Sequence, residues 1–388
     1  LPKGPANFYT IPWTATMTLP VAIVVRVGGE YGTGHLKRAQ LIQQKLLQKR
    51  FPTILFIEQM PEQLPFGFQA PPLDHYCQLS SLWREEETSF PLARFAFFWE
   101  TFIKSIHPDK SLPDLVRASP IFSVILVDGR DHDREQLKPM RHYSRFLLLY
   151  DDMGTARELA HACLDVLVDR QKLMPCAGQS LSGWPYLVLN PPSPKPPAGT
   201  TKNPDIVILT GQNDPFSLEH RLLSFLGSQK LLEGNRLNLS LFLSYKDLFR
   251  TMKTKLPALQ SDKLTVYFYG DDYGQLQGLL KEAKVLVSYF SLTLFEAWLM
   301  DTLPVLYAPR PYHKRLSEQL LQQSRLEGAT VFFPGKEHNE DGYADLLLAL
   351  QWTIKHYPAL TKTRTKAPKG LDYGGAERIA QFIQKTSE

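Results

Sequence analysis

The segment VAIVVRVGGEYGTGHLKRAQ, residues 21–40, joins an apolar run to a glycine-containing turn and then to an amphipathic stretch. This order predicts a buried strand followed by a helix that begins near His35. The turn carries Gly32, Thr33 and Gly34, and it directs backbone N–H groups of a helix N-terminus toward any bound anion, phosphate above all. The helix dipole favours a neutral His35, which is a competent general base near pH 7. The alternative is that His35 only caps the helix while the glycines shape a tight turn.

The same alternation of apolar runs and amphipathic stretches continues along the chain. The expected strands are residues 21–27, 53–58, 121–127, 146–150, 205–210, 237–243, 264–269, 284–288, 304–307 and 330–333. The expected helices are residues 35–49, 217–232, 273–281, 294–300, 314–326 and 344–355. Strands that are apolar throughout and alternate with helices predict parallel sheets covered on both faces. The fold class is therefore α/β, with two doubly wound, Rossmann-like domains that face a central cleft.

A proline-rich stretch, PPSPKPPAGTTKNP at residues 191–204, predicts a stiff, extended linker between the two domains. It separates an N-terminal domain, residues 18–190, from a C-terminal domain, residues 205–370. An extended segment, residues 1–17, precedes them and lacks the pattern of a signal peptide. A helix at residues 371–388 follows them. Residues 63–107 are rich in aromatics and prolines and predict an insertion of short helices and loops.

The composition excludes several classes of protein. Of the 388 residues, 43% are hydrophobic and 21% are charged, which is globular composition. A net charge of +5 without a clustered basic stripe argues against a nucleic-acid partner. The cysteines, Cys77, Cys163 and Cys176, show no CxxC spacing and predict reduced thiols in a cytoplasmic protein. No apolar run approaches the ~18 residues of a membrane span, and no pattern predicts a cofactor.

Polar side chains follow two expected strands of the first domain. Asp128 ends the strand at residues 121–127, at the rim where a cleft would lie. The next residues include Asp131, His132 and Asp133, which predict a solvated polar turn rather than a metal site, because no second ligand cluster accompanies them. Asp151 and Asp152 follow the strand at residues 146–150. Either carboxylate faces the cleft, or Asp152 caps a helix that begins near Thr155.

Two further turns lie in the second domain. The stretch TGQNDP contains Gly211 and Asp214, and it predicts either a capped strand–helix turn or a ligand loop. The stretch SYFSLTLFE contains Ser291, Thr293 and Glu296 at the start of a helix. Hydroxyls there bind phosphate, and a glutamate one turn later accepts hydrogen bonds from a ribose diol. The alternative is a capping box, with Thr293 as the N-cap and Glu296 at the third helical position.

Taken together, these stretches resemble the family of the pseudaminic-acid pathway UDP-sugar hydrolase and the spore-coat polysaccharide biosynthesis protein G. The matching N-terminal positions are Arg26, Gly32, Gly34, His35 and Arg38, followed by Asp128 and the pair Asp151 and Asp152. The matching positions of the second half are residues 211–215, 292–296 and 374–383. The resemblance covers most of the chain from residue 21 onward. It implies the GT-B fold, with a second half similar to the lipid II-forming N-acetylglucosaminyltransferase.

The resemblance also implies a site. His35 would be the base that activates water against the anomeric carbon, with UDP as the leaving group, and Asp128 and Asp152 would be the other catalytic residues. Ser291 and Thr293 would contact the diphosphate, and Glu296 the ribose. The remaining substrate-binding or nucleotide-binding positions would be Arg26, Gly32, Thr33, Gly34, Arg38, Gly211, Asp214 and His313. The chain departs from the family where Phe290 and Ser291, with Tyr289 beside them, replace glycines and where Tyr312 and His313 replace Asn-Gln.

Three functions follow from these observations. The first is a hydrolase that cleaves the sugar–phosphate bond of a UDP-sugar-like donor in glycan biosynthesis, with no metal or cofactor. The second is a glycosyltransferase, in which the basic run TKTRTKAPK at residues 361–369 serves an acceptor or a peripheral contact with an anionic membrane. The third, motivated by the lost glycines, is a GT-B protein that binds a sugar or nucleotide without catalysis.

Overall fold

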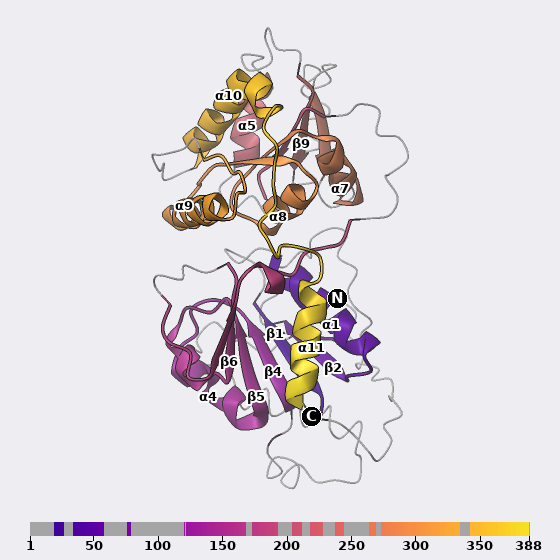
Figure 1. Ribbon diagram of the computed structural model, residues 1–388, viewed down its shortest axis with the longest axis vertical. Coiled ribbons are helices and arrows are strands. Elements are labelled where there is room, and N and C mark those ends of the chain that lie inside the picture. Colours follow the sequence, from indigo (N-terminus) through magenta and orange to yellow (C-terminus); the bar gives the residue numbers. More distant parts are fainter. Residues whose placement is uncertain are drawn as a thin grey trace.

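The computed structural model describes residues 19–26, 34–57, 76–78, 120, 122–167, 173–192, 204–211, 218–227, 237–243, 264–268, 273–333 and 342–387. These residues form two α/β lobes, one above the other in Figure 1. The extended segment 1–17, Gly32, Thr33, Asp214 and most of the predicted linker and insertion lie outside the described residues.

The first lobe is built on a sheet with the strand order β3-β2-β1-β4-β5-β6-β7. Its strands are β1 (Val21–Val25), β2 (Thr53–Ile57), β3 (Tyr76–Gln78), β4 (Phe122–Asp128), β5 (Ser144–Tyr150), β6 (Ala162–Asp165) and β7 (Gln179–Ser182). The chain leaves β1 toward β2 on one side and enters β4 on the other. The strand order therefore reverses between β1 and β4, and ligands of open α/β sheets bind at the carboxyl ends of the strands at such a reversal.

The second lobe repeats this plan with the strand order β10-β9-β8-β11-β12. Its strands are β8 (Ile206–Leu209), β9 (Leu239–Leu243), β10 (Leu264–Phe268), β11 (Val285–Ser288) and β12 (Leu303–Leu306). Here the reversal lies between β8 and β11. The ten strand pairings of the described residues are all parallel, as the apolar runs predict.

Helices cover both faces of each sheet. In the first lobe, α1 (Gly34–Gln48) and α11 (Gly375–Ser387) pack on one face, and α4 (Arg134–Tyr143) and the 3-10 helix η4 (Thr155–Leu159) pack on the other. In the second lobe, α5 (Leu218–Gly227) and α10 (Tyr343–Leu360) lie opposite α7 (Tyr273–Glu282) and α8 (Leu292–Leu299). The helix α9 (Pro311–Leu326) follows β12. Among the described residues, no helix combines the length and the apolarity needed to cross a membrane.

The lobes are joined by the chain and by shared packing. The chain crosses back from the second lobe after α10, and α11 lies along the first lobe beside α1 (Figure 1). Leu294 and Trp298 of α8 belong to the same apolar cluster as α1 and α11. The short 3-10 helix η6 (Trp184–Tyr186) contributes Trp184, whose indole N–H donates to Glu327 at the end of α9 over 2.8 Å.

Most expected elements are confirmed, with shifts of up to five residues at their ends. One expected strand is wrong: in 330–333, only Phe332 pairs, in an isolated bridge with Val305. Five elements were not expected, namely β3, β6, β7, α4 and the 3-10 helix η6. β7 has the sequence QSLS and is mostly exposed, and α4 has the polar sequence REQLKPMRHY, so neither carries the apolar pattern on which the prediction depends.

Candidate functional site

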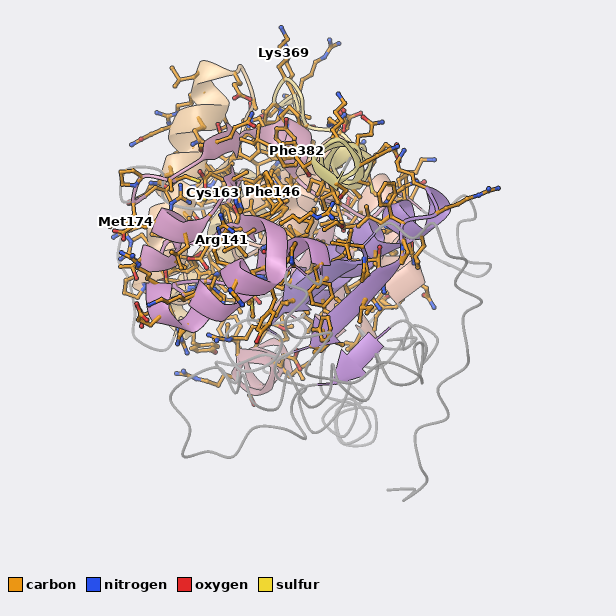
Figure 2. All side chains as sticks on the ribbon, turned by 90° about the horizontal axis from the view of Figure 1, so that it is seen from below. Arg141, Phe146, Cys163, Met174, Lys369 and Phe382 are labelled. Atoms are coloured by element: carbon orange, nitrogen blue, oxygen red, sulfur yellow. The ribbon has the colours of Figure 1, made fainter. Side chains whose placement is uncertain are left out.

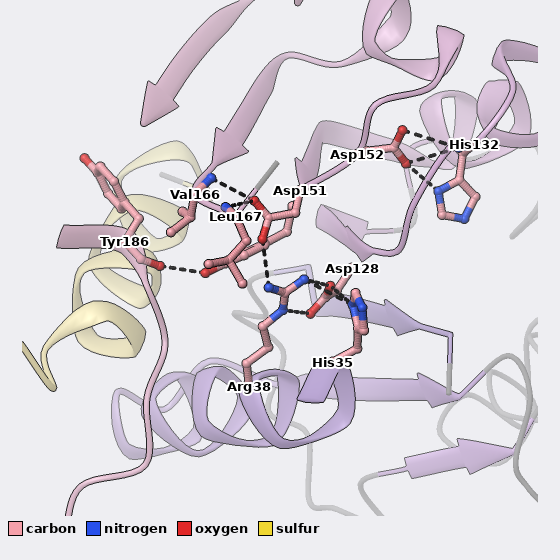
Figure 3. Close-up of polar contacts among 10 residues, drawn as sticks. His35, Arg38, Asp128, His132, Asp151, Asp152, Val166, Leu167 and Tyr186 are labelled. Carbon is pink, nitrogen blue, oxygen red and sulfur yellow. Dashed lines mark hydrogen bonds and ion pairs between the residues drawn. The ribbon is translucent and has the colours of Figure 1, made fainter. Parts of the chain in front are cut away.

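The candidate site lies where the first sheet reverses its strand order. Asp128 is the last residue of β4 and pairs in register with Val25, the last residue of β1. The helix α1 begins nearby, and its first turns carry His35 and Arg38. Figure 3 shows both side chains pointing from α1 toward Asp128. The position follows from the β1–turn–α1 connection, because a helix that follows a parallel strand starts at the carboxyl end of the sheet.

His35 and Asp128 form a buried pair. The exposed fractions of the two residues are 6% and 1%, and His35 Nδ1 lies 2.7 Å from Asp128 Oδ1. Burial alone would raise the pKa of Asp128, but the Arg38 guanidinium and His35 lower it to about 2, so the carboxyl is ionised and can only accept. The contact with Asp128 favours the tautomer that has its proton on Nδ1 and Nε2 as the basic atom, whereas Arg38 Nη2, which can only donate, lies 3.1 Å from the same Nδ1. Burial lowers the pKa of His35, against the opposing effect of Asp128, which keeps the ring neutral near pH 7.

Arg38 joins Asp128 to a second carboxylate. Its Nε donates to Asp128 Oδ2 over 2.5 Å, its Nη2 donates to Asp128 Oδ1, and its Nη1 donates to Asp151 Oδ2 over 2.8 Å. The guanidinium also lies over the ring of Tyr150, 4.0 Å from its centroid. The other Asp151 oxygen accepts the backbone N–H groups of Val166 and Leu167, over 2.7 and 2.8 Å. Arg38 thus bonds both carboxylates at once, as Figure 3 shows.

The structure places Asp152 apart from this cluster. Asp152 Oδ2 lies 2.5 Å from His132 Nδ1, and its Oδ1 accepts the Gly154 N–H over 2.8 Å. This pair holds the turn between β4 and α4, and its two residues are both buried. The prediction of a solvated turn is therefore confirmed for Asp131 and Asp133, which are exposed, and wrong for His132, which is buried. No group of three metal-ligating side chains occurs among the described residues.

The second lobe approaches the site through the N-termini of α8 and α9. A Cβ on Gly34 would lie 3.4 Å from the Leu292 side chain, so the first turns of α1 and α8 adjoin. The Arg130 guanidinium lies 4.6 Å from the ring centroid of Tyr312, in the first turn of α9. Burial lowers the pKa of His313 to about 3, and Arg130 adds to this effect. These contacts bring His313 and the start of α8 to the lobe interface that also borders His35.

At the start of α8 the structure excludes one of the two interpretations of the sequence, the capping box. Ser291 is the N-cap and Thr293 lies inside the helix, so the predicted capping box with Thr293 as the N-cap is wrong. Glu296 is 2% exposed, and its carboxylate accepts the Asn190 N–H over 3.2 Å. Burial raises the pKa of Glu296, while Lys37 of α1 opposes the rise. Glu296 therefore stands between the lobes, and its predicted contact with ribose stays a prediction.

Gly211 lies against the aromatic ring of Tyr289. Its φ is +100°, a value that favours glycine, and a Cβ there would lie 2.2 Å from the Tyr289 hydroxyl oxygen. Tyr289 follows β11, and its ring packs edge-on against Tyr307 and His313, with centroids 5.9 and 5.0 Å apart. The ring thus lies across the reversal between β8 and β11. The remaining predicted residue, Arg26, directly follows β1, half-buried, and its N–H donates to the Asp128 carbonyl over 3.5 Å.

Sequence reasoning missed Asp151 as the second partner of Arg38. The signal was present, because Asp151 ends a strand in the same way as Asp128. No sequence signal paired Lys37 with Glu296 or Arg130 with Tyr312, since each pair joins residues from different lobes.

Comparisons with known proteins show the fold. No family model and no curated protein matches the sequence. Among solved structures, MurG from Acinetobacter baumannii is similar over 94% of this chain and 99% of that chain, with 13% identity and a TM-score of 0.52. S. aureus MnaA, solved together with UDP, is similar over 95% and 96%, with 10% identity and a TM-score of 0.53. The chain has the GT-B fold.

The GT-B fold accounts for the arrangement of the candidate site. The glycotransferase of kitacinnamycin is also similar, over 96% of this chain and 100% of that chain, with 9% identity and a TM-score of 0.50. The similarity spans both lobes, so the predicted α/β, GT-B-like fold class is confirmed. In this GT-B chain, the carboxyl ends of the two sheets meet at the contacts of α1 with α8 and of Arg130 with Tyr312.

Proposed function

We propose that this protein is an enzyme of glycan biosynthesis that cleaves the sugar–phosphate bond of a UDP-sugar-like donor, with His35 as the general base. The observation that carries the proposal is the buried contact of His35 with Asp128 at the lobe interface. A histidine whose Nδ1–H is held by a carboxylate presents Nε2 as a base of fixed direction. Structures of the same fold include one with UDP, which supports the class of donor. The cytoplasmic location belongs to the same proposal.

The reaction requires a single proton transfer in the first lobe. His35 Nε2 takes a proton from water while the water oxygen bonds to the anomeric carbon. The bond between that carbon and the phosphate oxygen breaks, and its electron pair leaves with UDP. Asp128 stabilises the imidazolium that forms, because its carboxyl stays ionised. If the oxygen belongs to a sugar or lipid hydroxyl instead of water, the same step makes the protein a glycosyltransferase.

Arg38 and Asp151 are positioning residues in this proposal. Arg38 binds both oxygens of Asp128, so the carboxylate cannot turn away from His35. Asp151 accepts a hydrogen bond from Arg38 Nη1 and is itself held by two backbone N–H groups, while burial raises its pKa. On the side of the leaving group, Ser291 and Thr293 at the N-terminus of α8 are the proposed contacts of the diphosphate, because backbone N–H groups and the helix dipole attract anions there.

The test compares His35→Gln with His142→Gln. His142 is an exposed histidine of α4 and serves as the matched control. We expect His35→Gln to lower kcat/KM for release of the nucleotide by about 10²- to 10⁴-fold, and His142→Gln to leave it unchanged. The assay follows UDP, GDP and CMP release from a panel of nucleotide sugars by chromatography. Equal turnover by His35→Gln and the unaltered protein would contradict the role of His35.

A second candidate is a protein that binds a sugar nucleotide without turnover. The contact of Tyr289 with Gly211 favours it, because an aromatic ring stands at the reversal of the second sheet where a ligand would approach the backbone. Calorimetry with the same panel separates the two candidates. Binding accompanied by His35-dependent turnover supports the enzyme, and binding without turnover supports the second candidate.

A further inference from the structure

Two cysteines of the first lobe lie together, away from the candidate site. Cys163 is in β6 and is fully buried, and Cys176 precedes β7 and is half-buried. Both pack into the apolar cluster on the face of the first sheet that α4 covers. The Cys176 sulfur lies 3.6 Å from the carbonyl oxygen of Gln179, which pairs with Ala162 in the register of β6 with β7, so it lies beside the strand that carries Cys163. Both thiols are reduced in the structure. These are the only cysteines whose side chains fall within the described part of the chain.

The backbone around Cys176 is held in place. Arg157 Nε donates to the Met174 carbonyl over 2.5 Å, and the Ala177 N–H donates to the Arg157 carbonyl over 3.1 Å. The Cys176 sulfur lies 3.8 Å from the Ala160 carbonyl oxygen, at the start of β6. In Figure 2, Met174 lies at the outer edge of the lobe and Cys163 lies further in. Cys176 is half-buried and Cys163 fully buried, so Cys176 is the more accessible of the two thiols.

The chemistry of the two thiols differs in a way that sets an order of reaction. The Cys163 thiol lowers the pKa of Cys176, and the backbone of Gly178 and the nearby Arg157 add to this effect. The same contact and burial raise the pKa of Cys163. The accessible thiol is thus the one that ionises first, and a thiolate is the nucleophile in thiol–disulfide exchange. The buried thiol lies next to it and can resolve a mixed disulfide.

We propose that Cys163 and Cys176 form a thiol–disulfide site, which a low-molecular-weight disulfide such as oxidised glutathione converts to an intramolecular disulfide. The Cys176 thiolate attacks one sulfur of oxidised glutathione, whose S–S bond breaks, and the departing glutathione thiolate takes up the proton that Cys176 lost. Cys163 then loses its proton and attacks the Cys176 sulfur, and the second glutathione leaves as a thiol. Two protein thiols are oxidised, and one glutathione disulfide is reduced to two thiols.

The third cysteine of the chain provides a matched control. Cys77 lies in β3, and the strand order places β3 at one edge of the sheet and β6 five strands away. With about 4.8 Å between neighbouring strands, the separation is roughly 24 Å. This distance is far beyond the ~7 Å between Cα atoms that a disulfide spans. Cys77 cannot pair with either thiol in the folded chain, so Cys77→Ser leaves the proposed site intact.

The experiment uses the full chain, reduced and then exposed to oxidised glutathione. The reaction is quenched by an alkylating agent, and disulfides are mapped by mass spectrometry of peptides. We expect one peptide pair linked through Cys163 and Cys176, both in the unaltered protein and in Cys77→Ser. In Cys163→Ser, we expect glutathione to remain attached to Cys176, because no resolving thiol is present. In Cys176→Ser, we expect no intramolecular disulfide and no glutathione on Cys163.

Two results would overturn the proposal. One is a Cys77→Ser protein in which Cys176 carries glutathione but no link to Cys163 forms. The other is a Cys77→Ser protein in which both Cys163 and Cys176 stay unmodified. Because the Cys77→Ser chain contains only the two proposed thiols and near-native packing, misfolding of a core variant does not enter either result. Neither result depends on the function proposed for His35, which is measured by turnover.

Discussion

The two sheets present different side chains at the same topological position. Between β1 and β4, the first lobe buries ionisable groups that bond one another, namely His35, Arg38 and Asp128. Between β8 and β11, the second lobe places the ring of Tyr289 against Gly211. Buried charges are stable only when each is paired and hydrogen-bonded, whereas aromatic packing needs only a matching surface. In the proposed function, proton transfer belongs to the first lobe, and the ring of Tyr289 occupies the corresponding position of the second lobe.

The largest expected effect is on the charged cluster. Arg38→Ala leaves Asp128 and Asp151 buried without their cation, and we expect a loss of about 3–5 kcal/mol in the free energy of unfolding. Urea unfolding followed by circular dichroism measures it. The control is Arg134→Ala, which removes an exposed ion pair with Glu158 at 3.3 Å and should cost at most about 1 kcal/mol. Equal losses in the two variants would show that the cluster does not depend on Arg38.

The second expected effect concerns the aromatic contact. Gly211→Ala places a side chain at a positive φ, which costs about 1–2 kcal/mol. Its Cβ also meets the Tyr289 ring, and such overpacking costs a further ~1–3 kcal/mol. A double-mutant cycle with Tyr289→Ala separates the parts, because only the overpacking disappears when the ring is absent. If Gly211→Ala costs the same in both backgrounds, Tyr289 does not press on Gly211 in solution.

A smaller effect is expected on ligand binding in the second lobe. Tyr289→Gly removes the ring from the reversal between β8 and β11, and we expect UDP to bind about tenfold more tightly, a gain of about 1.4 kcal/mol. Isothermal titration calorimetry with UDP measures the change. Tyr289→Phe keeps the ring and is the control, with unchanged affinity. Weaker binding by Tyr289→Gly would mean that the ring supports the nucleotide instead of excluding it.

The smallest expected effect is the change of kcat/KM and of folding stability with pH that the lowered pKa of His35 causes. The pKa of His35 is lowered below 6.5, and only the neutral ring accepts a proton, so kcat/KM should rise with pH and level off with a midpoint below 6.5. Folding stability should change with pH in the same direction as kcat/KM. The unfolded histidine binds a proton more readily than the folded one, so stability falls as the pH drops below 6.5. A kcat/KM profile with its midpoint at or above 6.5 would contradict the assigned environment.

The fold could be predicted from the sequence to a large extent, because it depends on local pattern. The apolar runs locate the central strands of both sheets, where every side chain is buried. The pattern fails at β7, an edge strand whose residues mostly face solvent, and at α4, whose sequence is largely polar. At 330–333, an apolar run is used for packing and for one bridge rather than for a strand. Each of these cases depends on which segments are neighbours in the fold, which the local sequence does not contain.

The candidate site also has a part that the sequence predicts and a part that only the tertiary structure decides. The sequence by itself placed His35 at the start of a helix and Asp128 at the end of a strand, because both positions follow from the alternation of strand, turn and helix. Only the tertiary structure brought them within 2.7 Å and chose Asp151 rather than Asp152 as the second partner of Arg38. The reason is geometric: which carboxylate faces the helix depends on the turn after β5, where Asp151 adopts a φ of +52°. The contact of Tyr289 with Gly211 likewise depends on two strands meeting side by side, which no local pattern specifies.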